Sequence, residues 1–376
     1  MADSIDKSVT DTKTTVEIPG AEEVIQEQKE QIEKVQTEGG PVEIEMDEEG
    51  GAEISFDPNA ASPEGGEDHF SNLAEFLDDG ILSELAQNLS DKYTEYKESR
   101  ADWAQSYREG LDLLGFKYQR RTQPFRGASS VTHPVLAEAV AQFQATAYKE
   151  LLPSDGPVRT QILGDVTAPK QDQANRVKDF MNYQLMDQMK EYEPEFDQML
   201  FYLPLSGSTF KKVYYDDLLG RAVSKFVHSD DLVVPYSATS LEDAEAIVHV
   251  IKISENELRK QQVSGFYKDV ELGEPPVIEN QITQKEQELE GVTQNGNEDQ
   301  FTLLEFHMDL DLEGYEDLGE DGEPTGIKIP YIVTLDTANT QILSIRRNYE
   351  AEDKLKKKVN YFVQFKFLPG TGFYGF

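Results

Sequence analysis

The chain has 376 residues, no cysteine and a formal net charge of −37. The absence of cysteine excludes thiol catalysis, disulfides and cysteine metal sites, and it fits a reducing compartment. Residues 1–70 carry −16 and residues 269–323 carry −17, so only −4 is left for all the others. Acidic segments of this kind stay solvated, and they argue against a protein that coats nucleic acid through a broad basic face.

The first predicted element is a disordered acidic tail, residues 1–69. Glycine pairs and four prolines interrupt it, and it has few apolar residues to bury. Ile25, Ile32 and Val35 form a faint helical stripe that is too short for a coiled coil. A helix that forms only on a partner is the alternative to disorder. The opening MADSIDKSVTDTK has no apolar core, so we expect no secretory signal there.

Apolar residues then recur at helical spacing, which predicts a helical region over residues 70–205. Gly80 is expected to separate a short first helix from a long second helix that ends near Gly115. Pro134 fits the first turn of a third helix, and Pro153 is expected to stop it.

A fourth helix is predicted over about residues 171–192, and Pro194 is expected to break it. A short helix is expected to follow and to end at Pro204. Each helix has an apolar stripe that we expect to be buried. The stripe of the fourth helix consists of Val177, Phe180, Met181, Leu185 and Met189. The stripe of the short helix consists of Phe196, Met199, Leu200 and Leu203.

The hydrophobic period switches to two after Gly207, which predicts a β-rich region over residues 206–376. STFKKVYYD and RAVSKFVH read as a hairpin around DLLG. The same alternation predicts strands in DLVVPY, AEAIVHVIKI, FTLLEFHMDL, IKIPYIVTLD, TQILSIRRNY and KKVNYFVQFKFLP. Ser254 with Glu257 three residues later predicts a capped helix. Residues 270–300 are expected to form a solvated acidic insertion, and the fold class is α+β with a mainly antiparallel sheet.

One stretch, FYLPLSGSTFKKVYYDD at residues 201–217, resembles a phosphate loop or a serine nucleophile. It lacks the second glycine of a Walker loop, and it joins a helix to a strand instead of a strand to a helix. A helix C-terminus repels anions. We therefore interpret Gly207 as a helix-ending glycine with a positive φ. Lys211 and Lys212 are expected on opposite faces of the following strand.

Other candidate sites are weak. The terminal GTGFYG, with Gly370, Gly372 and Gly375, matches a dinucleotide fingerprint, but no helix or acid follows it, so we interpret it as a flexible turn. The acids of HMDLDLEG lack EF-hand spacing and are expected to form a solvated edge. The basic residues Arg120, Arg121 and Arg126 favour a solvated loop or a subunit contact over a phosphate site.

The histidines give no stronger signal. No two of the five have the spacing of a helical zinc pair. His133 near Ser129 and Ser130 could be catalytic, but no orienting carboxylate is evident from the sequence. We therefore expect no catalytic, cofactor-binding or metal-binding residues and no enzyme activity. Active sites are assembled in space, however, so missing motifs do not prove this.

Several long stretches resemble the portal proteins of tailed bacteriophages, particularly the short-tailed phages. They cover roughly residues 93–267 and include GLDLLGFKYQRRTQPFRGASSVTHPVLAEAVAQFQATAYKELLPSDGPVRT, DFMNYQLM and YLPLSGSTFKKVYYD. LGRAVSKFVHSDDLVVPYSATSLEDAEAIVHVIKISENELRKQQVSGFY and the terminal NYFVQFKFLPGTGFYGF are also similar. Portals of this type continue past such a terminal segment, so we expect this chain to hold mainly the peripheral wing-like region.

The resemblance implies a non-catalytic ring, usually a dodecamer, at one vertex of the capsid in the virion. Double-stranded DNA passes through its channel during packaging and ejection without sequence-specific contacts. The implied partners are further copies of the chain, the major capsid and scaffolding proteins, the terminase large subunit and a head–tail adaptor, with assembly in the host cytoplasm. Two alternatives stay open: a capsid-interior or adaptor protein that binds the portal or scaffold, and a metal-dependent hydrolase built on His133.

Overall fold

The computed structural model forms two compact units, Met1–Ser71 and Asn72–Phe376. The structure describes parts of both units. The described residues are 43–46, 52–55, 69–114, 125–128, 133–216, 219–273, 282, 284–286, 300–319, 323–368 and 372–375.

The first unit contains an antiparallel strand pair, β1 (Glu43–Met46) and β2 (Ala52–Ser55), in which Ile44 is opposite Ile54. This strand pair lies within the acidic tail predicted over residues 1–69. The sequence here alternates apolar and acidic residues on either side of a glycine pair, which is a hairpin pattern. The predicted stripe of Ile25, Ile32 and Val35 lies outside the described residues.

The second unit combines helices with two antiparallel sheets, which confirms the α+β fold class. Its described helices are η1 (Leu73–Glu75), α2 (Asp79–Ser99), α3 (Ala101–Leu114), α4 (Val135–Leu151), α5 (Ala168–Tyr183), η2 (Gln184–Gln188), α6 (Tyr192–Ser206) and α7 (Glu255–Val263). Ser254 caps α7 by accepting the backbone N–H of Glu257 at 3.3 Å, as predicted.

The strands of the second unit form a three-stranded sheet of order β10-β3-β4 and a five-stranded sheet of order β5-β6-β7-β8-β9. Their bounds are β3 (Ser208–Asp216), β4 (Arg221–Val227), β5 (Leu232–Val233), β6 (Ala246–Ser254), β7 (Gln300–Leu310), β8 (Ile329–Asp336), β9 (Gln341–Arg347) and β10 (Phe362–Lys366). The last strand pairs with β3, so it belongs to a different sheet from β7, β8 and β9.

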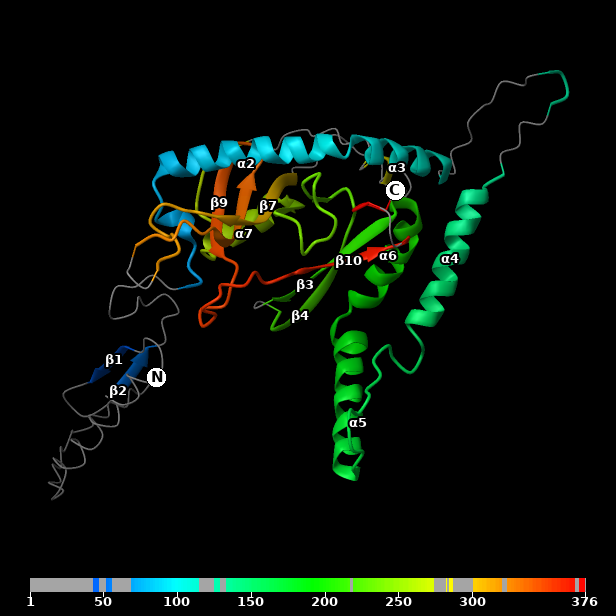
Figure 1. Ribbon diagram of the computed structural model, residues 1–376, viewed down its shortest axis with the longest axis horizontal. Helices are drawn as coiled ribbons and strands as arrows, with labels where there is room; N and C mark the ends of the chain where they lie inside the picture. Colours follow the sequence, from blue (N-terminus) through cyan, green and yellow to red (C-terminus); the bar gives the residue numbers. More distant parts are fainter. Residues whose placement is uncertain are drawn as a thin grey trace, which may run out of the picture. The chain divides into compact units, whose positions relative to one another are not determined.

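Helix α2 covers one face of the five-stranded sheet. Its buried residues Leu82, Ala86 and Leu89 pack with apolar side chains of β6, β7, β8 and β9, and Figure 1 shows the helix lying across these strands. A short first helix and a long second helix are present, as predicted, but the break between them lies at residues 76–78, before Gly80. Asp78 accepts the Gly80 N–H at 2.7 Å and caps the helix, so Gly80 lies in its first turn.

The long predicted helix is instead divided at Arg100, between α2 and α3. The buried Arg100 guanidinium donates to the backbone carbonyls of Ser229, Asp230 and Leu232 and to the Asp230 carboxylate at 3.1 Å. These bonds satisfy the carbonyls of Ser229 and Asp230 just before β5, and they share the Leu232 carbonyl with the Tyr374 hydroxyl. Arg100, at the break between α2 and α3, therefore links the helices to the β-rich region through hydrogen bonds.

The predicted fourth and short helices also have different limits. Helix α5 ends at Tyr183, and a π-helical turn leads to α6, which begins at Tyr192. Pro194 lies in the first turn of α6, where a missing N–H is tolerated, and Pro204 lies inside this helix, which continues to Ser206. Phe196, Met199, Leu200 and Leu203 are buried as predicted.

The acidic insertion is not solvated throughout. Ile282 and Glu286 are only 3% and 8% exposed. Ile282 packs in the apolar cluster of Trp103, Tyr107 and Leu111, and the Tyr107 hydroxyl donates to the Glu286 carboxylate at 2.7 Å. The high acidic content of this segment led us to expect full solvation, but Ile282 and Glu286 contact α3.

Candidate functional site

The stretch at residues 201–217 is a structural corner, as predicted. Gly207 has φ 80° and ends α6, with its N–H donating to the Leu203 carbonyl at 3.0 Å. The Ser206 hydroxyl is buried and donates to the Tyr202 and Ser208 carbonyls. A hydroxyl turned inward in this way is not presented to a substrate, and the nearby helix end is the end that repels anions.

The terminal glycine motif explains why residue 207 must be glycine. A Cβ atom on Gly207 would lie 2.6 Å from the Tyr374 carbonyl oxygen, and one on Gly375 would lie 2.5 Å from the Gly207 carbonyl oxygen. Phe373 is buried, and Tyr374 stacks on Trp103 with ring centroids 4.7 Å apart. Residues 372–375 do form a turn, with the Gly375 N–H donating to the Gly372 carbonyl at 3.1 Å, but the expected flexibility is wrong, because Phe373, Tyr374 and Gly375 pack against the core.

The two lysines of this stretch lie on opposite faces of β3, which confirms the prediction. The Lys211 ammonium lies 4.4 Å from the ring centroid of Tyr192 and 5.4 Å from that of Phe196, both on α6. The Lys212 ammonium lies 2.6 and 2.9 Å from the two oxygens of Glu305 on β7. The lysines therefore serve separate packing contacts and do not form one phosphate site.

Glu305 is the centre of a mostly buried cluster of charged and titratable groups between the two sheets, in which His307 is buried and the side chains of Lys212, His249 and Glu305 are half-buried. Besides Lys212, its carboxylate contacts His307 Nε2 at 2.7 Å, and His249 Nδ1 lies 3.8 Å away. Burial alone would raise the pKa of Glu305, but the Lys212 ammonium and the two imidazoles outweigh it and hold the pKa well below its usual value. Burial lowers the pKa of both histidines, against the opposing effect of Glu305.

Sequence spacing did not reveal this cluster, because its members come from three strands. Strand pairing places His249 opposite Glu305, and alternation places His307 on the same face two residues along β7. The usable signal was a charged residue and a histidine at alternate positions of the apolar strand FTLLEFHMDL. His307 is buried and the Glu305 side chain is 13% exposed, and the two are paired, as expected for polar groups in or near a core.

The other candidates do not assemble into a site. His133 is exposed just before α4, while Ser129, Ser130, Arg120 and Arg121 lie outside the described residues. Arg126 is exposed. Within the described part of the chain, no group of three or more histidine, aspartate or glutamate side chains has the arrangement of a metal site.

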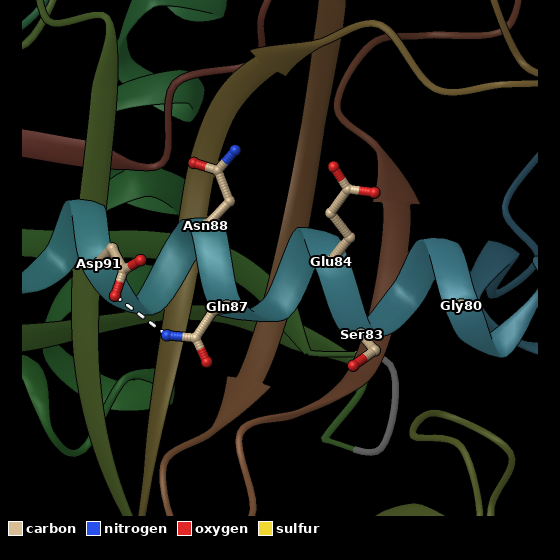
Figure 2. Close-up of a pocket in the computed structure, with 6 residues that line it drawn as sticks. All are labelled: Gly80, Ser83, Glu84, Gln87, Asn88 and Asp91. Carbon is tan, nitrogen blue, oxygen red and sulfur yellow. Dashed lines mark hydrogen bonds between the residues drawn. The ribbon is translucent and has the colours of Figure 1, made fainter.

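A shallow hollow on the surface of α2 does not form a ligand site either. Figure 2 shows that the residues lining it all come from this one helix, and a hydrogen bond of 3.0 Å joins Gln87 to Asp91. The lining residues are Gly80, Ser83, Glu84, Gln87, Asn88 and Asp91. They form the polar outer face of an amphipathic helix, and no second element closes over a ligand there.

Helix α5 has an apolar face that remains exposed to solvent. No side chain of this helix, which is described throughout, is buried. The predicted burial of its stripe is wrong, because Val177, Phe180 and Met181 are 45%, 58% and 43% exposed. Figure 1 shows α5 pointing away from the two sheets. We call Val177, Phe180 and Met181 the arm face.

One side of α5 does contact its own chain. The extended segment before the helix runs back along it, and the Asn182 side chain bonds both the N–H and the carbonyl of Val158, at 2.9 and 3.3 Å. Thr160 donates to the Ala174 carbonyl at 3.1 Å. The extended segment therefore holds α5 in place and leaves the arm face open.

None of the helices in the described residues is long and apolar enough to span a membrane. Neither a scan against models of known protein families nor a search of curated proteins finds a match for the chain.

Proposed function

We propose that the chain is a subunit of a portal ring, through which double-stranded DNA is packaged into and ejected from a phage capsid. The observation that carries this proposal is the arm face, an apolar helix surface that the chain's own fold leaves open. The resemblance of residues 93–267 to phage portals supports the same assignment.

The arm face favours an assembly protein on energetic grounds. A helix of 16 residues is marginal in water on its own, and most helical stability in proteins comes from packing an apolar face. Three neighbouring large apolar side chains at helical spacing form such a face. A second copy of the chain that covers it in a ring would supply the missing packing.

The charge of the chain is compatible with a DNA channel. Lys and Arg side chains that neutralise many phosphates bind DNA tightly and in a salt-dependent manner. A chain with a net charge of −37 does not offer many such phosphate contacts, so DNA would move through the channel without being held. In this function the subunit performs no chemistry, and its partners are the capsid and scaffolding proteins, the terminase large subunit and a head–tail adaptor.

Electron microscopy of the purified chain tests the proposal, at concentrations well above micromolar. We expect closed rings with a central pore. Phe180→Glu with Met181→Glu on the arm face should abolish the rings while leaving the circular dichroism spectrum unchanged. Asn175→Glu adds a charge to another side of the same helix and should leave the rings intact.

Two outcomes would contradict the proposal. Monomers from the unmodified chain that bind a preformed portal ring would favour the capsid-interior or adaptor alternative. Metal-dependent nuclease activity that His133→Ala removes would favour the hydrolase alternative.

A further inference from the structure

An ionic contact between half-buried side chains, Lys212 and Glu305, lies beside apolar packing where the two sheets of the second unit meet. On β3, Phe210 and Lys212 alternate onto the face where Phe210 packs with Ile247 of β6. Lys212 continues this face and reaches Glu305 of β7. Phe362, the cross-strand partner of Lys212 in β10, has its ring centroid 5.2 Å from His307 and 5.4 Å from His249. The cluster therefore belongs to the contact between the sheets.

The cluster contains the imidazoles of His249 and His307, and Glu305 is the carboxylate that contacts them. With neutral histidines, the Lys212 ammonium and the Glu305 carboxylate balance each other. His307 contacts the same Glu305 oxygen that lies within 2.6 Å of Lys212. A proton on either imidazole would add a positive charge beside Lys212 in a site where His307 is 2% exposed. Uncompensated charge in such a place is strongly unfavourable.

The surrounding groups do not supply a full counter-charge. Besides Glu305 and Lys212, the ionisable groups that act on the histidines are Asp231, on the His249 side, and Lys358, on the His307 side. Tyr361 faces the His307 ring, and Tyr267 acts on Glu305. Lys358 opposes protonation of His307, and Asp231 lies next to His249 without a hydrogen bond to it among the described contacts.

We propose that this cluster is an acid-sensitive contact between the two sheets, which is closed at neutral pH and opens locally when His249 and His307 bind protons. Histidines whose pKa is lowered in the closed state bind protons more readily once the contact opens. The stabilisation is therefore present above the ordinary histidine pKa of 6.5 and is lost as the pH falls below it. Each histidine that is protonated only in the open state shifts the opening equilibrium about tenfold per pH unit.

Hydrogen–deuterium exchange of the full chain tests this proposal, with rates corrected for the intrinsic effect of pH. Between neutral and mildly acidic pH, we expect protection to fall at least about tenfold in β3, β10, β6 and β7. Protection in β9, on the far side of the five-stranded sheet, should stay unchanged. An equal loss of protection in every strand would indicate global unfolding and would overturn the proposal.

Substitutions identify the responsible groups. His249→Gln and His307→Gln remove the protonation step but keep a polar side chain, so each should weaken the pH dependence of exchange in β3 and β10. His133→Gln, an exposed position, should leave it unchanged. If His307→Gln does not fold, His249→Gln still decides the question. Wild-type pH dependence in a folded His249→Gln variant, or in both variants, would contradict the proposal.

Discussion

The two faces of the β10-β3-β4 sheet bury neighbouring lysines in opposite ways. Lys212 contacts both oxygens of Glu305 and belongs to a paired cluster between the sheets. Lys211 is 3% exposed, lies over the rings of Tyr192 and Phe196, and its ammonium has no hydrogen-bond partner among the residues that the structure describes. The half-buried ammonium of Lys212 is compensated and the buried ammonium of Lys211 is held mainly by aromatic rings, so their contributions to stability should have opposite signs.

Removing the compensated lysine should have the largest effect. Lys212→Met leaves the Glu305 carboxylate buried beside two neutral imidazoles, without its cation. We expect the free energy of unfolding to fall by about 3–5 kcal/mol, as is typical when one partner of a buried ion pair is removed. Urea denaturation followed by circular dichroism measures this loss.

Two further variants separate charge from packing in that result. Lys212→Met combined with Glu305→Gln removes both charges and keeps an acceptor for His307, so it should recover about 2 kcal/mol of the loss. Lys225→Met changes the exposed lysine opposite Lys212 in the hairpin and should have an effect within about 0.5 kcal/mol. No recovery in the double variant would show that Lys212 acts through packing alone.

The comparison depends on the register of β3, which begins directly after Gly207. Gly207→Ala places a side chain at φ 80° and brings its Cβ to 2.6 Å from the Tyr374 carbonyl oxygen. We expect a loss of about 2–4 kcal/mol from strain and displacement of residues 372–375. Thermal unfolding followed by circular dichroism measures it.

Gly220 is the matched control for this substitution. It also has a positive φ, 60°, but a Cβ atom added there would meet no atom within 4 Å beyond its two chain neighbours. Gly220→Ala should therefore show only backbone strain, about 1 kcal/mol. Equal losses at the two glycines would mean that the contact with Tyr374 contributes nothing.

How much of this was predictable from sequence can be seen at particular residues. Period-two spacing correctly predicted that Lys211 and Lys212 face opposite ways, and the order of helix and strand correctly identified Gly207 as a corner, because both are local properties of the chain. The partner of Lys212 was not predictable, since Glu305 lies 93 residues away in sequence and only sheet packing brings it near.

The error at α5 has a related cause. Helical spacing correctly indicated a helix through Val177, Phe180 and Met181, but the same spacing does not say what covers the apolar face. Burial is a property of the tertiary or quaternary structure. The break at Arg100 was missed because it depends on carbonyls more than a hundred residues later in the chain.

The smallest expected effect concerns Lys211. Burial lowers the pKa of this lysine to about 8, against the opposing effects of Glu195 and Glu191. Lys211→Met keeps a long apolar stem against Tyr192 and Phe196 but removes the buried charge. Since a cation–π contact returns only about 0.5–2 kcal/mol, we expect the free energy of unfolding at pH 7 to rise by about 1 kcal/mol.

The pH dependence of this difference shows whether charge is the cause. Between pH 8 and the ordinary lysine pKa of 10.5, the unfolded chain binds a proton at Lys211 that the folded chain has released. The stability contributed by residue 211 in the unmodified protein therefore rises with pH across this window, because the cost of a buried ammonium disappears. Urea denaturation of both proteins at pH 7, 8, 9 and 10 should show that the advantage of Lys211→Met falls with rising pH and is lost before pH 10. Ionisation of tyrosines that do not contact residue 211 affects both proteins alike and cancels in the difference, and Tyr192→Phe in both proteins removes the contribution of the one tyrosine under the ammonium. An advantage that is constant from pH 7 to pH 10 would mean that methionine simply packs better against the rings, and the contrast between the two lysines would then be one of shape instead of charge.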